Sequence, residues 1–451
     1  MYIPFRKGWF RYCFRLTMVM VLVHYLSFCG YGQAAKNDSL LQEPTLETVI
    51  QYALNHQPAV QQSLVDEAII DRAIRGRLAD WYPQINFAFS AQHNFQLPTT
   101  VFQGNTVKLG LDNISAAQFS LTQNLFNRDV LLASKTAKVV RLQSSQNTAD
   151  VKIQVAADVT KAYYAVLLNL QQIKLANEDI DRLQQNYKYA YAQYQAGLVD
   201  KTDYKRATIA LNNANAVRRT VGENLDVRYS NLKQLMGYPM DGELKLRFDS
   251  LALVRSVYLD TSQNVDFTRR IEYQQLQTQH KLLEAQVRYE KWGFLPSVSL
   301  FANYNLNFQN NALAKLYYNT FPQSYAGINL GIPIFQGLKR VHAIKESEWQ
   351  LRRLDWDVVQ LQNSVNNEFT SAMAAYKSAY SNYLVLKENL ELATDVFNVV
   401  SLQYKSGVKA YIELFSAEAD LRTAQINHLN AAYQLLSSRV DVQKALGQIV
   451  Y

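Results

Sequence analysis

Cysteine is nearly absent from this sequence of 451 residues. It holds two, Cys13 and Cys29, and both fall within residues 1–32. If that segment is removed, the mature chain has no thiol, which excludes disulfides and cysteine-based metal sites. The six histidines are scattered without metal-ligand spacing, and there is no glycine-rich phosphate loop or nucleophile elbow. The sequence therefore predicts a protein that is not an enzyme and that needs no cofactor and no metal.

A concentrated excess of charge is also missing. The formal net charge is +8, but Arg6, Lys7, Arg11 and Arg15 supply half of it before any acidic residue occurs. The other basic residues are spread along the chain, which is typical of solvated helix faces rather than of a nucleic-acid-binding stripe. We therefore expect no nucleic-acid partner.

The first residues predict a secretory signal peptide over 1–32. A basic section at 6–15 precedes an apolar run at 16–28, and small residues follow at Gly30 and Gly32, two apart, as signal peptidase requires. This segment indicates that the chain leaves the cytoplasm.

Cleavage is expected before Gln33 or near Ala34. Two alternatives stay open. One is an N-terminal membrane anchor, although the apolar run is shorter than the ~20 residues of a spanning helix. The other is lipidation of Cys29, although Phe28 occupies a position where a lipoprotein signal requires a small residue.

Glycine and proline are missing from two long stretches, 128–196 and 338–406, and Gly197 and Gly407 follow them directly. These are the residues that a helix interior tolerates least, and glycine is the usual residue after a helix end. Read as one helix, each stretch would be about 100 Å long at 1.5 Å per residue. Such a helix is too long for a compact core and needs neighbours along its whole length.

The two stretches belong to a duplicated unit. The interval between Gly197 and Gly407 equals the interval between Gly237 and Gly447. Three further pairs keep the same interval: Tyr194 and Tyr404, Ala207 and Ala417, Ala214 and Ala424. A series in register indicates two tandem repeats of one architecture.

The apolar period changes from 3.6 to 2 in four segments: 84–97, 114–125, 297–308 and 325–335. Apolar residues alternate there with uncharged Asn, Gln, Ser and Thr, and only Phe301 breaks the rule. Polar connections join the segments in pairs, so each pair predicts a β-hairpin.

The length of these strands suits a bilayer. About 12 residues at 3.3 Å each, tilted near 45°, rise roughly 28 Å, close to the hydrocarbon thickness. Two soluble hairpins would alternate in the same way, but the signal peptide favours a membrane barrel. Because a sheet in lipid must close, and known barrels begin at about eight strands, several copies must combine. The strand count does not choose between two copies and three.

The predicted fold is mainly α-helical with a β-barrel contribution. Repeat 1 covers 33–237, an equatorial linker covers 238–266 and repeat 2 covers 267–451. Each repeat has long antiparallel helices and one β-hairpin. The predicted elements are helix 46–82, strands 84–97 and 114–125, long helix 128–196 and helix 198–237, then helix 267–294, strands 297–308 and 325–335, long helix 338–406 and helix 408–447.

Short motifs stand at the ends of these elements. They are Leu46-x3-Ile50-x2-Ala53-Leu54-x3-Pro58, Pro83 and Pro296 before strands, Leu125-Phe126 and Ile334-Phe335 after strands, the run Tyr194–Asp203 with its partial copy Tyr404–Gly407, and Leu235-Met236-Gly237 with Ala445-Leu446-Gly447. Together they resemble the TolC family of outer-membrane efflux proteins over nearly all of the mature chain.

The resemblance implies a homotrimer in the outer membrane of a Gram-negative bacterium, in contact with outer-membrane lipid. Three chains would form a twelve-stranded barrel continued by an α-helical barrel in the periplasm. The implied function is the passive export duct of a tripartite efflux or secretion system, supplied by an inner-membrane pump and a periplasmic adaptor, or membrane fusion, protein. The alternative is a periplasmic coiled-coil spacer or adhesin without a pore, but a spacer would keep a strict seven-residue repeat, from which these helices drift.

The resemblance also implies a periplasmic gate at the two helix turns, formed by Thr202, Asp203, Tyr404, Lys409 and Glu413. Asp203 corresponds to an acid that locks the closed entrance, and Tyr404 to a tyrosine that bonds across to it. Lys409 stands where the family often has Arg. Three copies of Glu413 around an axis would repel one another and attract cations.

Ser416 departs from the family pattern, which often has a second acid at this position, and this weakens the case for a cation site. The alternative for Asp203 and Lys409 is that they are ordinary solvated charges near a turn. For the adaptor contact we expect Gly197, Leu198, Val199, Gly407 and Val408, because exposed apolar residues at a helix turn suit an interface.

Overall fold

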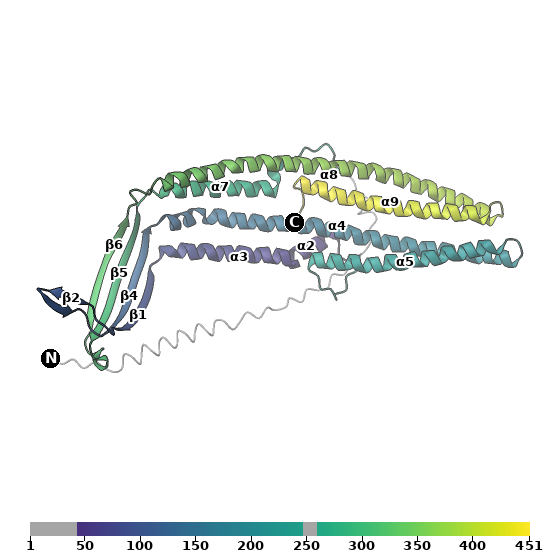
Figure 1. Ribbon diagram of the computed structural model, residues 1–451. Helices are drawn as coiled ribbons and strands as arrows, with labels where there is room; N and C mark the ends of the chain where they lie inside the picture. Colours follow the sequence, from purple (N-terminus) through teal and green to yellow (C-terminus); the bar gives the residue numbers. More distant parts are fainter. Residues whose placement is uncertain (1–42, 247–258) are drawn as a thin grey trace. The chain divides into compact units, whose positions relative to one another are not determined.

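The computed structural model describes residues 43–246 and 259–451 (Figure 1). The predicted signal peptide, both cysteines and part of the predicted linker 238–266 lie outside these residues. Within them the chain is mainly helical, with a four-stranded sheet and a separate two-stranded ribbon. None of the described helices has an apolar stretch long enough to cross a membrane.

The first repeat contains α2 (Leu46–His56), α3 (Pro58–Leu78), the 3-10 turn η1 (Ala79–Trp81), β1 (Gln84–His93), β2 (Thr99–Phe102), β3 (Asn105–Lys108), β4 (Asn113–Phe126), α4 (Arg128–Gln195) and α5 (Lys201–Met236). The second contains η2 (Phe267–Arg269), α7 (Ile271–Trp292), β5 (Ser297–Asn310), η3 (Leu313–Lys315), β6 (Phe321–Gly331), α8 (Lys339–Lys405) and α9 (Tyr411–Ala445). The order of helix, hairpin, long helix and returning helix is therefore the same in both halves.

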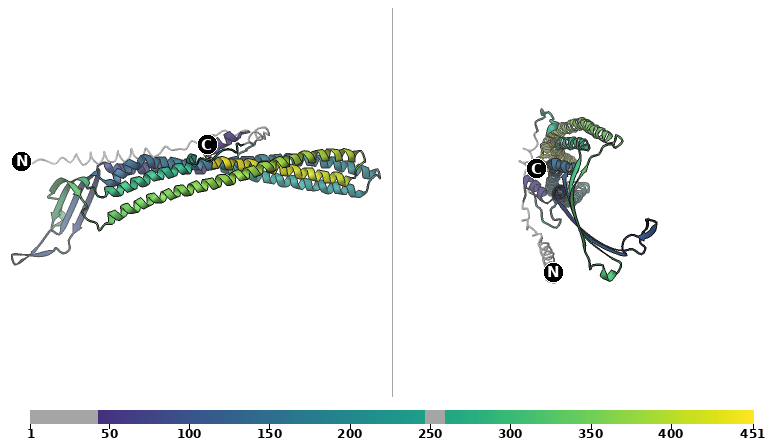
Figure 2. Two further views of the ribbon diagram at one scale, coloured as in Figure 1. Left: turned by 90° about the horizontal axis from the view of Figure 1, so that it is seen from above. Right: turned by 90° about the vertical axis from the view of Figure 1, so that its left-hand side faces the viewer.

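The two long helices, α4 and α8, are continuous because neither contains a proline, which would remove a backbone hydrogen bond. Two shorter helices lie along each of them: α3 and α5 along α4, and α7 and α9 along α8. In addition, α4 packs against α7 and α9, so the two halves are in contact along its length (Figures 1 and 2). Each long helix thus has the neighbours that its length requires.

The predicted helix 46–82 is divided at Gln57, which is extended with φ −63° and ψ 124°. The cause is Pro58, because the residue before a proline is pushed out of the helical region while proline itself suits the first helical position. The end of α2 then meets the end of α5. Gly237 has φ 67°, and a Cβ there would stand 2.8 Å from the carbonyl carbon of His56, so only glycine fits this junction.

The four-stranded sheet is antiparallel throughout, in the order β1-β4-β5-β6. The β4–β5 pair joins the hairpin of one repeat to the hairpin of the other. Phe87, Phe119 and Tyr304 lie side by side on one face, and their side chains are exposed. On the other face Gln118 donates to Asn303 at 3.2 Å. The sheet thus has one apolar and one polar face, and its outer strands β1 and β6 each have one neighbour.

The exception, Phe301, lies on the polar face opposite Gly327. Its ring covers the glycine, since a Cβ on Gly327 would stand 2.8 Å from Cζ of Phe301. The ring of Tyr325 lies edge-on to that of Phe301, with centroids 6.3 Å apart. A glycine on the neighbouring strand therefore makes room for the aromatic ring that breaks the alternation.

The bounds of all four predicted strands differ from the sequence prediction, most of all in β1 and β6. β6 begins four residues early, at Phe321, and ends at Gly331 because Pro333 has no N–H for the ladder. β1 ends at His93, since the Asn94 side chain bonds the carbonyl of Leu111 at 2.9 Å. The ribbon β2–β3 lies within the polar segment that was predicted only as the connection between the first two strands.

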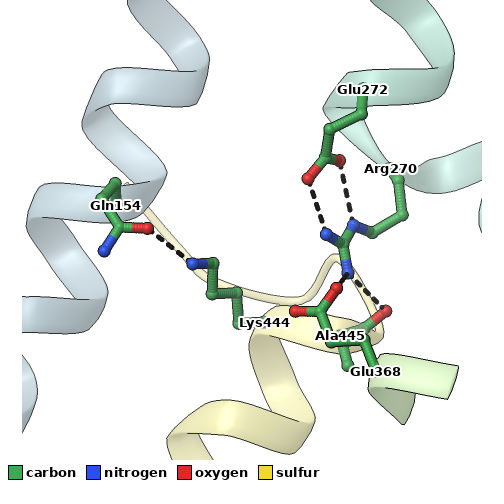
Figure 3. A network of polar contacts seen from close by, with 6 residues as sticks. All are labelled: Gln154, Arg270, Glu272, Glu368, Lys444 and Ala445. Atoms are coloured by element: carbon green, nitrogen blue, oxygen red, sulfur yellow. Dashed lines mark hydrogen bonds and ion pairs between the residues drawn. The ribbon is translucent and has the colours of Figure 1, made fainter. Parts of the chain in front are cut away.

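A buried arginine joins three helices near the start of α7 (Figure 3). The Arg270 side chain donates twice to Glu272, at 2.6 and 3.0 Å, and at 3.0 Å to Glu368 of α8. It also donates at 3.1 Å to the carbonyl of Ala445, the last residue of α9. Burial disfavours the charge on Glu272, but the hydrogen bonds from Arg270 outweigh it and lower the pKa of that carboxyl.

We predict that Arg270→Met lowers the unfolding free energy by about 2 kcal/mol, because two partly exposed carboxylates and the carbonyl of Ala445 lose their hydrogen-bond donor. Thermal unfolding in detergent, followed by far-ultraviolet circular dichroism, measures this. The control is Arg269→Met, since Arg269 is exposed and its ion pair with Asp266 should contribute no more than about 1 kcal/mol. Because the pKa of Glu272 is lowered, the stabilisation is complete above the ordinary carboxyl pKa and is lost as pH falls through the lowered value. Equal losses in the two variants would contradict the prediction.

Candidate functional site

The two turns that follow the long helices lie at the end of the helices remote from the sheet (Figure 1). Their backbones are alike. Gly197 has φ 73° and Gly407 has φ 75°, the left-handed conformation of a helix-terminating glycine. The N–H of Leu198 donates to the carbonyl five residues earlier at 3.0 Å, and that of Val408 does the same at 2.9 Å. The duplication therefore extends to the hydrogen bonds of the turns.

The residues predicted to contact an adaptor occupy these turns. Leu198 and Val408 are each 74% exposed, while Val199 is half-buried. The two glycines carry no side chain, so Leu198 and Val408 form the apolar surface of each turn. Their role in adaptor binding remains a prediction.

Tyr404 lies in a buried cluster beneath the turns that joins α4, α5, α8 and α9. Its ring meets those of Tyr189 and Tyr411 edge-on, with centroids 5.5 and 5.7 Å apart. Burial first, and then the negative charge of Asp203, raises the pKa of Tyr404 to about 12. Its hydroxyl therefore stays protonated and able to donate.

The acceptor for this hydroxyl is Gln193 of α4, whose Oε1 lies 3.3 Å away. The resemblance implied a bond from Tyr404 to Asp203, and within the described part of the chain no such bond is formed. A second bond follows the same path, from the hydroxyl of Tyr189 on α4 to the carbonyl of Lys405 at 3.1 Å. Two tyrosines thus tie the end of α8 to the end of α4.

Lys409 forms an ion pair with Glu413, one turn further along the chain. Both side chains are partly exposed, so this pair contributes little, about 0–1 kcal/mol. The structure therefore places Lys409 beside Glu413 rather than beside Asp203.

Thr202 and Asp203 lie in the first turn of α5. The N–H and hydroxyl of Thr202 donate to Oδ1 of Asp200, the N-cap residue, at 3.1 and 3.2 Å. Asp203 stands where a carboxylate complements the helix dipole. The contacts of these two residues in the chain are thus those of a helix start.

A cluster of charged residues that was not foreseen lies between α4 and α9. Arg182 pairs with Asp179 in the same helix, and Arg422 Nε of α9 reaches the other oxygen of Asp179 at 3.0 Å. Glu418 is only 2% exposed and accepts from Asn186 Nδ2 at 3.1 Å. Its second oxygen, Oε1, has no hydrogen-bond partner, although Arg182 Nε lies 3.9 Å from it.

Burial is the largest influence on Glu418 and raises its pKa, and the two arginines offset this only in part. A sequence signal for the site existed. Glu418 falls on the apolar stripe of α9, between the buried Leu414 and Leu421 at helical spacing. An acid in such a stripe indicates a buried partner.

We predict that Glu418→Gln raises the unfolding free energy at neutral pH by about 1 kcal/mol, because an uncharged amide costs less to bury than the carboxylate. Because the pKa of Glu418 is raised, its charged form costs stability above that pKa, and the cost disappears as pH falls through it. The gap between variant and parent should therefore close on acidification. The measurement is the thermal midpoint in detergent against pH. Glu388→Gln, an exposed change on α8, is the control and should show no gap.

Within residues 43–246 and 259–451, no three or more His, Cys, Asp and Glu side chains converge as metal ligands would. The polar groups described above instead join one helix to another.

Comparison with known proteins identifies the family. The family model described as "Outer membrane efflux protein" matches residues 49–238 and 268–448. Outer membrane protein TolC of Escherichia coli K12 is 21% identical over 444 residues, covering 94% of this chain and 85% of TolC. Protein CyaE of Bordetella pertussis is 23% identical over 413 residues, covering 91% of this chain and 85% of CyaE.

The fold agrees with a solved structure. The CmeC outer membrane channel of Campylobacter jejuni superposes with a TM-score of 0.71 at 14% identity, covering 93% of this chain and 90% of CmeC. The resemblance stated above is confirmed, and an outer-membrane efflux or secretion channel, rather than a spacer without a pore, is the function of this chain. The chain belongs to the outer membrane efflux protein family.

Proposed function

We propose that three copies of this chain close into a twelve-stranded barrel in the outer membrane, continued by an α-helical barrel in the periplasm, and that this assembly is a passive export duct. The observation that carries the proposal is the sheet, with an exposed apolar face and two outer strands that have only one neighbour each. In lipid those free backbone groups must be paired, and pairing β1 of one copy with β6 of the next achieves this.

Barrel width favours three copies over two. Eight strands leave an interior that side chains just fill, whereas wider barrels leave a channel. The polar face of this sheet carries Asn, Gln, Ser and Thr, which suit a water-filled interior. A duct therefore needs more than the eight strands of two copies.

The long helix α8 supplies a second contact between copies. Val385, Leu392 and Val399 follow one another at seven-residue intervals and are each more than half exposed. A local heptad of exposed apolar residues is the seam by which one helix packs on another. We place the neighbouring copy against this seam.

The entrance of the duct lies at the two turns. We propose that the bonds of Tyr404 to Gln193 and of Tyr189 to Lys405 hold α8 against α4 in the closed arrangement, with Thr202, Asp203, Lys409 and Glu413 around them. A periplasmic adaptor would bind the exposed Leu198 and Val408 with their neighbours Gly197, Val199 and Gly407. An inner-membrane pump would deliver the substrate.

We predict that the purified protein in mild detergent has the mass of three chains. Light scattering with correction for bound detergent measures the protein mass directly. A mass of one or two chains would contradict the barrel.

We predict that Tyr404→Phe raises single-channel conductance in a planar bilayer, because it removes the hydroxyl that bonds α8 to α4 while keeping the ring. The pair Asp203→Asn with Lys409→Gln removes the two charges that the family resemblance assigns to the gate. Because the Lys409–Glu413 pair does not join α8 to α4, this double change should raise conductance less than Tyr404→Phe does. The control is Asp181→Asn with Lys174→Gln, two exposed changes on α4. If all variants conduct like the parent, the gate does not lie at these residues.

A further inference from the structure

A cavity of about 670 Å³ lies where the strands meet the helices. Its walls come from the ends of β4, β6 and α7 and from the starts of α4, β5 and α8. Both repeats contribute residues to this cavity. In the sequence these residues are far from the turns that form the proposed entrance. The export function described above does not use it.

Three basic residues line this cavity: Arg128 at the start of α4, and Lys339 and Arg340 at the start of α8. The two arginines converge over Gly293, the residue that ends α7. A Cβ on Gly293 would stand 2.8 Å from Nη1 of Arg128 and 3.5 Å from Cδ of Arg340. The bare backbone of this glycine thus leaves room for the side chains of two arginines, one from each half.

Two acids, Asp129 and Glu290, also line the cavity, so the three basic residues leave a net positive charge of one. Glu290 approaches Arg128 only to 3.9 Å, and Asp129 accepts a hydrogen bond of 2.6 Å from Tyr289. Lys339 and Arg340 form no ion pair with any residue that the structure describes. Arg340 instead donates to the carbonyl of Pro333 at 3.4 Å and lies over the ring of Phe294. A cavity lined by more cationic than anionic side chains attracts an anion.

Apolar side chains accompany the cations. Leu295 and Ile332 line the cavity and are 47% and 58% exposed, and Ile334 and Phe335, just beyond it, are 95% and 81% exposed. They stand at the end of the apolar face of the sheet, at the level where a membrane barrel meets the interface. A ligand that satisfies both sets of residues carries an anionic group and a hydrocarbon chain.

We propose that this cavity binds a glycerophospholipid of the periplasmic leaflet of the outer membrane. The guanidinium groups of Arg128 and Arg340 and the ammonium of Lys339 hold its phosphate, for which Arg offers paired N–H donors. The acyl chains lie on Ile334 and Phe335. A cavity of this volume suits a headgroup, and a free phosphate ion would have no use for the apolar rim. The site would fix the height of the barrel in the membrane.

The test uses the assembled protein in detergent micelles containing phosphatidylglycerol, with bound lipid per chain counted by native mass spectrometry. Lys339→Gln with Arg340→Gln should lower bound phosphatidylglycerol at least fivefold. The matched control, Lys345→Gln with Arg352→Gln, changes the same charge on α8 outside the cavity and should bind like the parent. Equal binding by parent and test variant, or an equal loss in the control, would overturn the proposal.

Two further measurements keep the result interpretable. Ile334→Gln with Phe335→Gln retains every charge and should also weaken lipid binding, which a site for any anion would not show. Excess inorganic phosphate, matched in ionic strength with chloride, should displace the lipid no better than chloride does. If phosphate displaces it fully and the apolar variant binds normally, the cavity is a simple anion site and the lipid proposal is wrong.

Discussion

The organisation of this protein depends on one constraint, which is that backbone N–H and C=O groups in hydrocarbon must be paired within protein. The described sheet has four strands, and its outer strands, β1 and β6, each lack a second neighbour. Among the described strands of this sheet, β4 and β5 have both edges paired, and four strands are too few to close a barrel by pairing β1 with β6. In the proposed barrel, each copy would also contribute its helices to a shared cylinder. The exposed apolar residues of α8 would then contact a neighbouring copy.

Buried charged residues form two different kinds of polar network between the helices. At Arg270 the guanidinium is bonded to Glu272, Glu368 and a carbonyl, so the network is well satisfied and joins three helices. Nearer the turns, Glu418 Oε1 and Arg182 Nε have no hydrogen-bond partner. A fully satisfied network makes a region rigid, whereas an unpartnered buried polar atom costs free energy. The Arg270 network therefore holds α7, α8 and α9 together, while the charged cluster between α4 and α9 joins these two helices at a cost that comes from Glu418.

The sequence predicted the fold correctly where a single residue type or a single spacing of apolar residues determines an element. This holds for the two long helices without glycine or proline, for the glycines that follow them and for the alternating strands. The errors come from interactions across the chain. Pairing with β5 extends β6 back to Phe321, and the side chain of Asn94 ends β1 early. The residues that the resemblance assigns to a gate do lie at the two turns, and their role stays a prediction, but their side-chain partners were not foreseen, because the resemblance gives positions and not side-chain contacts. The cavity around Gly293 was missed altogether, since its basic residues are separated by more than two hundred positions in the sequence.

The contacts at the turns differ in how well they could hold the proposed entrance closed. The ion pair of Lys409 with Glu413 is partly exposed and joins residues of the same chain segment, so breaking it does not separate α8 from α4. The bond of Tyr404 to Gln193 is sheltered, joins those two helices and lies in a cluster with Tyr189 and Tyr411. Because the hydroxyl of Tyr404 remains protonated up to about pH 12, this bond does not respond to the pH of the surroundings. In the proposed gate, opening would then depend on displacement of the helix ends rather than on a change of pH. The exposed Leu198 and Val408, each fixed to one of the two turns, are where a partner protein could apply it.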